Sequence, residues 1–111
     1  MEKRIVKNIE FSKAVAVADI IEYQDGKVIS MTFAQNAAVS ITLFAFSKGE
    51  EISTHESSGD AIVHILDGVA KVTIGEDKIN AAKGQIVVMP ANIPHSIDAI
   101  ENFKMLLTVV K

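Results

Sequence analysis

The sequence predicts an all-β fold, a sandwich or a small barrel, and two observations carry the prediction. Glycines stand at positions 26, 49, 59, 68, 75 and 84, mostly seven to ten residues apart. The stretches between them are rich in Val, Ile, Thr and Phe, which favour short strands joined by turns. Helical periodicity is almost absent, and this combination is typical of sandwiches and small barrels.

Six stretches are predicted to be strands: 28–34, 38–46, 61–66, 69–74, 85–89 and 102–110. Apolar and polar residues alternate cleanly in 69–74, where Ala70, Val72 and Ile74 share one face. In 61–66 the residues of both parities are apolar. We therefore expect that strand to be covered on both sides.

A single helix is expected around 15–22, with Ser12 as its candidate cap. No Glu or Gln follows Ser12 at the third position, so the capping signal is incomplete.

A chain of 111 residues suffices for one core and is too short for two. We expect one domain over 1–111, with 1–27 an N-terminal extension that leads into the barrel.

Composition and charge exclude several function classes. The formal net charge is −3 and Lys and Arg do not cluster, so no surface is suited to nucleic acid. The absence of cysteine excludes disulfides and thiolate metal sites, which leaves His, Asp and Glu as plausible ligands. Charged residues interrupt every apolar run near the N-terminus, so we expect a cytoplasmic protein without a membrane partner.

Two constellations of glycine and histidine stand out along the chain. Gly49 is followed after five residues by His55, and Gly68 closes this first stretch. In the second stretch, Gly84 is followed after five residues by Pro90. The second stretch continues with Asn92 and His95.

These two stretches resemble the two motifs of the cupin superfamily, and the chain looks like a small single-domain cupin of the cupin-2 type. The resemblance covers roughly residues 38–109 and implies a jelly-roll β-barrel of two antiparallel sheets with little helix. Asn92 stands where the second motif has a turn glycine, a tolerable change because Asn accepts positive φ.

The resemblance also implies where a cupin metal ion would be held. His55 and His95 match two of the family's four ligands, while Ser57 and Ala61 occupy the positions of a histidine and a glutamate. Two imidazoles hold an ion poorly, because stable sites generally use three protein ligands or more. The sequence therefore predicts a degenerate metal site.

Two further ionisable residues have competing interpretations. Asp60 lies one place before the glutamate position and faces outward on a regular strand, unless a bulge at Gly59 turns it inward. The favoured interpretation is a turn aspartate that caps its own backbone. His64 has the opposite parity to Ala61, so we expect it on the outer face or at a dimer contact.

The ligand pocket is predicted to contain His55, Ser57, His95 and Met89, and the cluster of Glu50, Glu51 and Glu56 is expected to be solvated. Apolar strand residues are core more often than pocket wall. The candidates for such a wall are Phe33, Phe44, Phe46, Met89, Met105 and Leu107.

Three functions remain open at this point. The favoured one is a metal-free module that binds a small organic molecule through His55, Ser57 and His95. The alternative is an oxygenase or isomerase in which His55, His95 and Asp60 hold one divalent ion, Fe, Mn, Ni or Zn. The third is metal-free catalysis with His55 or His95 as general base. Whether any metal is bound stays open.

We also expect a homodimer. A small barrel exposes strand faces that it cannot cover alone, and the stretches 61–66 and 85–89 are both strongly apolar. A second copy of the chain would bury these outer faces.

Overall fold

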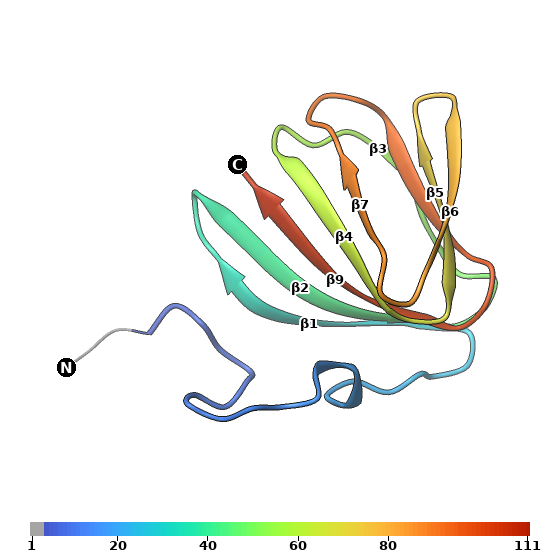
Figure 1. Ribbon diagram of the computed structural model, residues 1–111. Coiled ribbons are helices and arrows are strands. Elements are labelled where there is room, and N and C mark those ends of the chain that lie inside the picture. Colours follow the sequence, from blue (N-terminus) through green and yellow to red (C-terminus); the bar gives the residue numbers. More distant parts are fainter. Residues whose placement is uncertain (1–3) are drawn as a thin grey trace.

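Strands dominate residues 4–111, the part of the chain that the computed structural model describes (Figure 1). A five-stranded antiparallel sheet has the order β1-β2-β9-β4-β7, and a four-stranded antiparallel sheet has the order β3-β8-β5-β6. The strands are β1 (Val28–Gln35), β2 (Val39–Phe46), β3 (Glu51–His55), β4 (Asp60–Asp67), β5 (Val69–Ile74), β6 (Asp77–Ala82), β7 (Ile86–Met89), β8 (His95–Ala99) and β9 (Phe103–Val110).

The two sheets face each other without a hydrogen-bonded ladder between them in the described chain. The closed barrel expected from the sequence is therefore not found there. The five-stranded sheet has one strand more than its partner, the edge strand β1. The order β2-β9-β4-β7 opposite β3-β8-β5-β6 is consistent with a jelly roll.

The six expected strands are present, one with the expected bounds and five with ends that differ by one residue, and β3, β6 and β8 are additional. The helix expected around 15–22 is only a 3-10 turn, η1 (Val17–Asp19). Its N-cap residue is Ala16 with no side-chain cap, so the expectation of a Ser12 cap was wrong. No helix in residues 4–111 is long and apolar enough to cross a membrane.

The main core lies between the sheets, where every second residue of each strand points inward. Phe46 of β2 and Phe103 of β9 are fully buried there, and their rings stack with centroids 4.5 Å apart. On β4 the inward residues Val63 and Ile65 are also fully buried. This core fixes the strands that carry the site.

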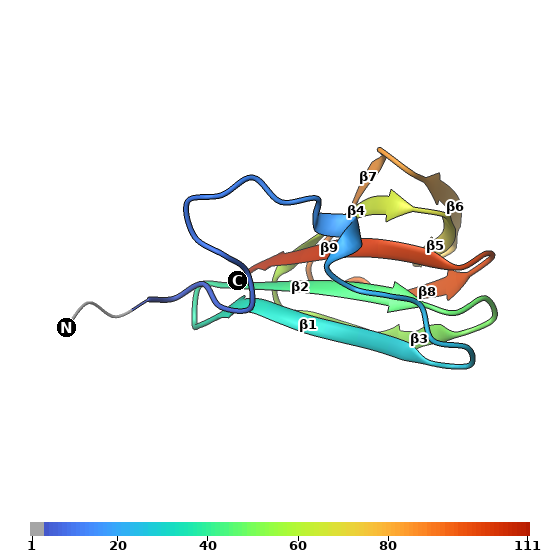
Figure 2. The same ribbon diagram turned by 90° about the horizontal axis from the view of Figure 1, so that it is seen from below.

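The segment that precedes β1 packs on the outer face of the five-stranded sheet (Figure 2). Ile21 is buried there against Leu43 and its neighbours. Polar contacts also hold the segment: for example, the Tyr23 hydroxyl donates to Asp67 at 2.5 Å, and the Lys104 Nζ donates to the Ala18 carbonyl at 2.6 Å. Residues 1–3 of the expected extension lie outside the described residues.

Candidate functional site

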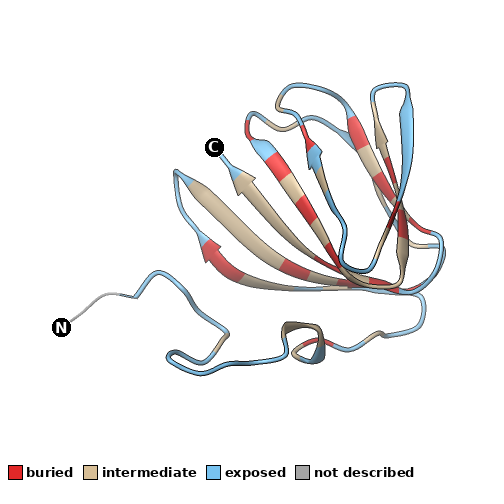
Figure 3. Cartoon of the chain, viewed as in Figure 1, coloured by how far each residue is buried: buried red, intermediate tan, exposed pale blue. Residues whose placement is uncertain are grey.

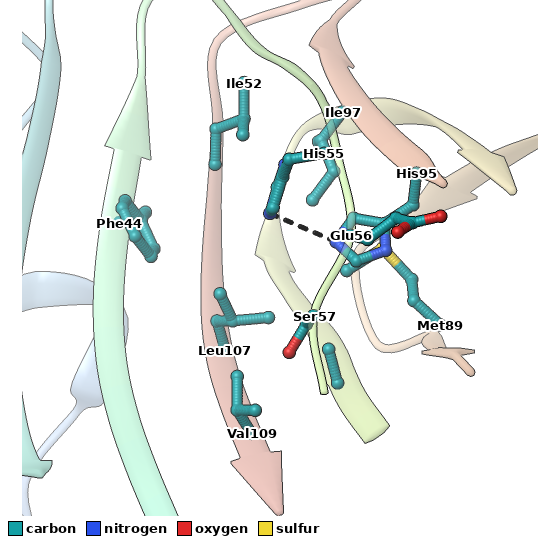
Figure 4. A pocket seen from close by; sticks show the side chains of 11 residues that line it. Phe44, Ile52, His55, Glu56, Ser57, Met89, His95, Ile97, Leu107 and Val109 are labelled. Atoms are coloured by element: carbon teal, nitrogen blue, oxygen red, sulfur yellow. Dashed lines mark hydrogen bonds between the residues drawn. The ribbon is translucent and has the colours of Figure 1, made fainter. Parts of the chain in front are cut away.

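The two motif histidines are a cross-strand pair in the four-stranded sheet. β3 and β8 run antiparallel, and their register sets His55 opposite His95. The two Nε2 atoms are 3.2 Å apart, and the rings meet edge to face with centroids 4.4 Å apart (Figure 4). The structure thus brings together two residues that are forty positions apart in the sequence.

The surroundings of the pair determine where its protons lie. The Nδ1 of exposed His55 is 3.0 Å from the Ser53 carbonyl oxygen, so in the neutral ring this nitrogen carries the hydrogen and donates. The Nε2 of His55 then accepts, and the Nε2 of His95 donates to it. This tautomer leaves the Nδ1 of His95 as a buried nitrogen without a hydrogen-bond partner.

His95 is the deep member of the pair, with only 2% of its surface exposed. Burial lowers the pKa of its imidazole, and the neighbouring His55 lowers it further. The Ile93 backbone acts weakly in the opposite direction, without reaching hydrogen-bond geometry to Nδ1. His95 is therefore neutral at neutral pH, and His55 stands between it and solvent.

The pair opens into a cavity of about 360 Å³ between the two sheets. This volume lies within the usual range for small-molecule sites, roughly 300–1,000 Å³. Its polar lining consists of His55, His95, Ser57 and, at the exposed rim, Glu56. The remaining wall is apolar and contains Phe44, Ile52, Ala61, Met89, Ile97, Leu107 and Val109 (Figure 4).

The loops of the two motifs are bound to each other at the mouth of the cavity. Asn92 adopts φ 63°, as expected for a residue in the place of a turn glycine, and its N–H donates to the Ser57 carbonyl at 2.7 Å. Beside it, the Ala91 N–H donates to the Asp60 carboxylate at 2.8 Å. These bonds fix the loop that leads into His95.

The Asp60 carboxylate therefore makes its hydrogen bond outside the cavity. Asp60 is exposed, it begins β4, and it caps the loop after β7 instead of its own backbone. It is not among the residues that line the cavity with the two imidazoles.

The two positions at which the resemblance implies lost ligands do face the cavity. Ala61 is 2% exposed and lies opposite Met89 in the ladder between β4 and β7. Ser57 also lines the cavity, although β3 ends at His55, so Ser57 belongs to the following loop and not to the strand. Its hydroxyl accepts a hydrogen bond from the Gly59 N–H at 3.2 Å.

The residues present do not fit a divalent metal ion with three protein ligands. Among residues 4–111, no three or more His, Cys, Asp or Glu side chains are grouped so that they could hold an ion. The spacing of the two Nε2 atoms, 3.2 Å, suits two ligands with bonds of about 2.1 Å to one ion. Among the described residues, no third metal-ligating side chain lies beside the two imidazoles.

Sequence reasoning sorted the apolar residues only in part. Phe44, Met89 and Leu107 line the cavity, whereas Phe46 and Met105 belong to the core and Phe33 packs on the outer face. Ile52 and Ile97 were missed because β3 and β8 were not predicted. Ile97 lies two positions after His95, whereas Ile52 lies three positions before His55, with a register shift between the two residues. Val109 also lines the cavity, as does Ala61, which the resemblance marked only as the position of a lost ligand.

His64 lies on the outer face of β4, as expected from its parity. In the ladders it is opposite Ile86 on one side and Leu106 on the other. Its ring is thus separated from the cavity by the five-stranded sheet.

Comparison with known proteins agrees with this geometry. A family model described as a cupin domain matches residues 42–111. A conserved protein of unknown function from Streptococcus pyogenes superposes with a TM-score of 0.96 at 41% identity, over 98% of this chain and 96% of the other. A cupin superfamily protein from Desulfitobacterium hafniense DCB-2 superposes with a TM-score of 0.90 at 34% identity, over 95% and 96% of the two chains.

A cupin enzyme is a more distant neighbour. Salicylate 1,2-dioxygenase from Pseudoaminobacter salicylatoxidans superposes with a TM-score of 0.69 at 16% identity, and the match spans 75% of this chain but 25% of the dioxygenase. This likeness concerns the fold alone. Because the family model covers more than half of the sequence and two relatives match nearly its full length, the chain belongs to the cupin family.

Proposed function

We propose that this cupin binds a small, mainly apolar organic molecule that carries one acidic or hydrogen-bonding group. The observation that carries the proposal is the imidazole pair, with Nε2 atoms 3.2 Å apart, inside an otherwise apolar cavity of about 360 Å³. A well-formed apolar pocket with a few convergent polar groups is the usual form of a ligand site.

Each polar residue has a distinct role in this proposal. His95, deep and neutral, and His55, at the mouth, hold the polar group of the ligand through their Nε2 atoms. Ser57 offers a hydroxyl from the loop, and Met89 contributes part of the apolar wall. Glu56 at the rim disfavours a second anionic group on the ligand.

An acidic ligand can be held without a net change of charge in the cavity. If the ligand enters as its neutral acid, or as an anion together with one proton, the imidazole pair takes up that proton and faces the anion as a cation. Binding of an anion at neutral pH then consumes a proton. Apolar walls strengthen this charge pair because they exclude water.

The test is isothermal titration of the purified protein with benzoate and cyclohexanecarboxylate, with benzamide as an uncharged analogue. Titrations in two buffers of different ionisation enthalpy measure the proton uptake. We expect proton uptake with the acids, and at least about tenfold weaker binding in His95→Gln, which corresponds to about 1.4 kcal/mol.

The control variant is His64→Gln, because His64 lies on the opposite face of the sheet. It should bind the acids as the wild type does. Equal loss of affinity in His64→Gln and His95→Gln, or binding of the acids without any dependence on His95, would refute the proposed site.

The alternative is a metal-dependent oxygenase or isomerase. Its support is the imidazole spacing, and it needs a third protein ligand, which Asp60 would supply only after giving up its bond to the Ala91 N–H. Metal analysis of the purified protein separates the two proposals. A stoichiometric Fe, Mn, Ni or Zn content that His55→Gln abolishes would favour the alternative.

A further inference from the structure

A second hollow, of about 500 Å³, lies beside the end of β1 and shares no lining residue with the imidazole cavity. One wall is the beginning of the N-terminal segment, and the other is the turn that joins β1 to β2. We call it the N-terminal hollow. Its lining residues are Arg4, Ile5, Lys7, Gln35 and Asn36.

The first wall of the N-terminal hollow is bonded to β1. The Lys7 N–H donates to the Phe33 carbonyl at 2.8 Å, and the Asn8 side chain donates to the Thr32 carbonyl at 2.7 Å. These bonds engage the backbone of Lys7 and not its ammonium group. The Lys7 side chain is therefore carried by a fixed piece of chain, and its charge can serve a ligand.

The second wall is a turn held by its own hydrogen bonds. The Asn36 Oδ1 accepts from the N–H groups of Ala38 and Val39, at 2.8 and 2.9 Å. The Asn36 carbonyl accepts from the Nζ of Lys111 at 2.9 Å. Both oxygens of Asn36 are thus engaged within the protein, and its side-chain nitrogen, a donor, is the group left to meet a ligand.

Arg4 is oriented by an aromatic ring. Its Cζ lies 4.5 Å from the centroid of the Phe11 ring, a cation–π distance. This contact uses one face of the guanidinium and leaves the N–H groups at its edge for hydrogen bonds. Glu10 is the single acid between positions 4 and 16, and its carboxylate is paired with Lys13 at 2.7 Å. That segment therefore supplies no further carboxylate to Arg4 or Lys7.

The N-terminal hollow is an accessible, positively charged place on an acidic protein. All five of its lining residues are exposed, and both of its walls belong to exposed stretches of the chain (Figure 3). Two of the five are cationic and none is acidic, in a chain whose net charge is −3. Two like charges repel each other, and an anion between them replaces that repulsion with attraction.

We infer that the N-terminal hollow binds a small soluble phosphate ester. A phosphate group is dianionic and has three terminal oxygens, so it can accept from the Arg4 fork, the Lys7 ammonium and the Asn36 amide together. The hollow is larger than bare phosphate needs, and Gln35 offers an amide to a polar organic body. The inference does not depend on the proposed function, because no residue of the imidazole cavity takes part.

The first test locates the site by NMR. Glucose 6-phosphate is titrated into isotope-labelled protein up to about 20 mM, which detects dissociation constants in the millimolar range. We expect saturable shifts of the backbone amides around Lys7 and Asn36, and none with glucose. Inorganic phosphate should bind at the same place more weakly, because it lacks the body that reaches Gln35. Added NaCl should weaken both, since the site is exposed and its charges are screened.

The second test removes the charges. Arg4→Gln combined with Lys7→Gln should bind glucose 6-phosphate at least about tenfold more weakly, because the dianion loses both counter-charges. The matched control is Lys78→Gln with Lys83→Gln, which removes the same net charge from exposed positions on and after β6. The control should bind as the wild type does. The NMR spectrum of each variant establishes that it is folded.

Four results would each overturn the inference. The first is the absence of saturable shifts with glucose 6-phosphate. The second is an equal loss of affinity in the two double variants, which would mean that net charge alone attracts the anion. The third is a set of shifts centred on His95 and Met89 of the imidazole cavity. The fourth is preferential binding to phosphatidylcholine vesicles that contain phosphatidate, measured by co-sedimentation, which would assign the hollow to a lipid headgroup.

Discussion

At the scale of single residues, the burial of His95 makes stability depend on pH. The pKa of His95 in the folded protein is lowered below the ordinary 6.5. Below pH 6.5 His95 is therefore protonated in the unfolded chain, whereas it stays neutral in the folded chain until the pH reaches the lower folded pKa. The contribution of His95 is complete above pH 6.5 and is lost as the pH falls through the folded pKa. Stability should therefore decrease on acidification.

Urea denaturation at pH 7.5 and at pH 5 measures this effect. The decrease in unfolding free energy between the two should be smaller in His95→Gln than in the wild type, whereas His64→Gln should retain the decrease that His95 causes. If His95→Gln keeps the full wild-type decrease, other groups are responsible and the account of the buried ring is wrong.

Gly68 illustrates a residue whose identity is set by two constraints at once. Its φ is +74°, and a Cβ there would lie 1.9 Å from the Asn102 carbonyl oxygen. Gly26 has a similar φ of +71° with nothing near the Cβ position. Gly26→Ala should cost about 1 kcal/mol from backbone strain, and Gly68→Ala at least about 3 kcal/mol, since the backbone must also move. Chemical denaturation measures the unfolding free energy of both variants, and the difference between their losses gives the cost of the steric clash at position 68.

At the scale of elements, the N-terminal segment is held by polar contacts around Tyr23. Burial and the hydrogen bond to Asp67 raise the pKa of the Tyr23 hydroxyl, which therefore remains a donor over the physiological range. The Nζ of Lys104 lies 4.9 Å from the centre of the same ring. These contacts link the segment before β1 to strands β4 and β9.

Tyr23→Phe should lower the unfolding free energy by about 1 kcal/mol, less than for a fully buried bond to a charged group because the contact is partly exposed. Combined with Asp67→Asn, the loss should be less than the sum of the single losses. Limited proteolysis should cut the segment before Val28 sooner in Tyr23→Phe. Unchanged cleavage would mean that apolar packing alone holds it.

The strands that the sequence predicted are those whose large apolar residues face the core. β8 escaped prediction because its inward residues are His95, Ile97 and Ala99, of which only one is a large apolar residue. β6 escaped because it is exposed except at Ala81 and Ala82. Residue hydrophobicity therefore misses a strand that is small or polar on its buried side.

The pairing of the two histidines was expected from the resemblance to the cupin motifs, but the details of the site were not predicted. The bond from the Ala91 N–H to Asp60 depends on a loop conformation that Asn92 sets with its positive φ. The expectation of a closed barrel was wrong for a similar reason. Closure depends on whether the edge strands of the two sheets pair with each other. Such features arise from chain geometry between elements, which residue patterns do not encode.

At the scale of the whole molecule, the cavity provides a way to link metal binding to global stability. Ser57 and Ala61 both line it, so Ser57→His with Ala61→Glu should add an imidazole and a carboxylate to the existing pair. The affinity of the double variant for divalent metal ions should then be well above that of the wild type. Added Mn, Ni or Zn should also raise the melting temperature of the variant, because the ion binds only the folded form.

The carboxylate must fit where Ala61 is buried, so without metal the variant should be less stable than wild type, by roughly 1–3 kcal/mol. Ala61→Gln with Ser57→Asn is a control of similar size. Equal metal affinity in the rebuilt variant and the wild type would show that positions 57 and 61 do not converge on the histidines.

We propose that the cavity beside His55 and His95 holds the polar group of a small organic ligand. A crystal structure of the protein purified without added ligand or metal, soaked with benzoate and recorded with anomalous scattering, tests it most directly. We expect a carboxylate within hydrogen-bond distance of both Nε2 atoms, with the ring against Phe44 and Leu107. A metal ion bound between the two imidazoles, or benzoate bound only outside the cavity, would contradict it.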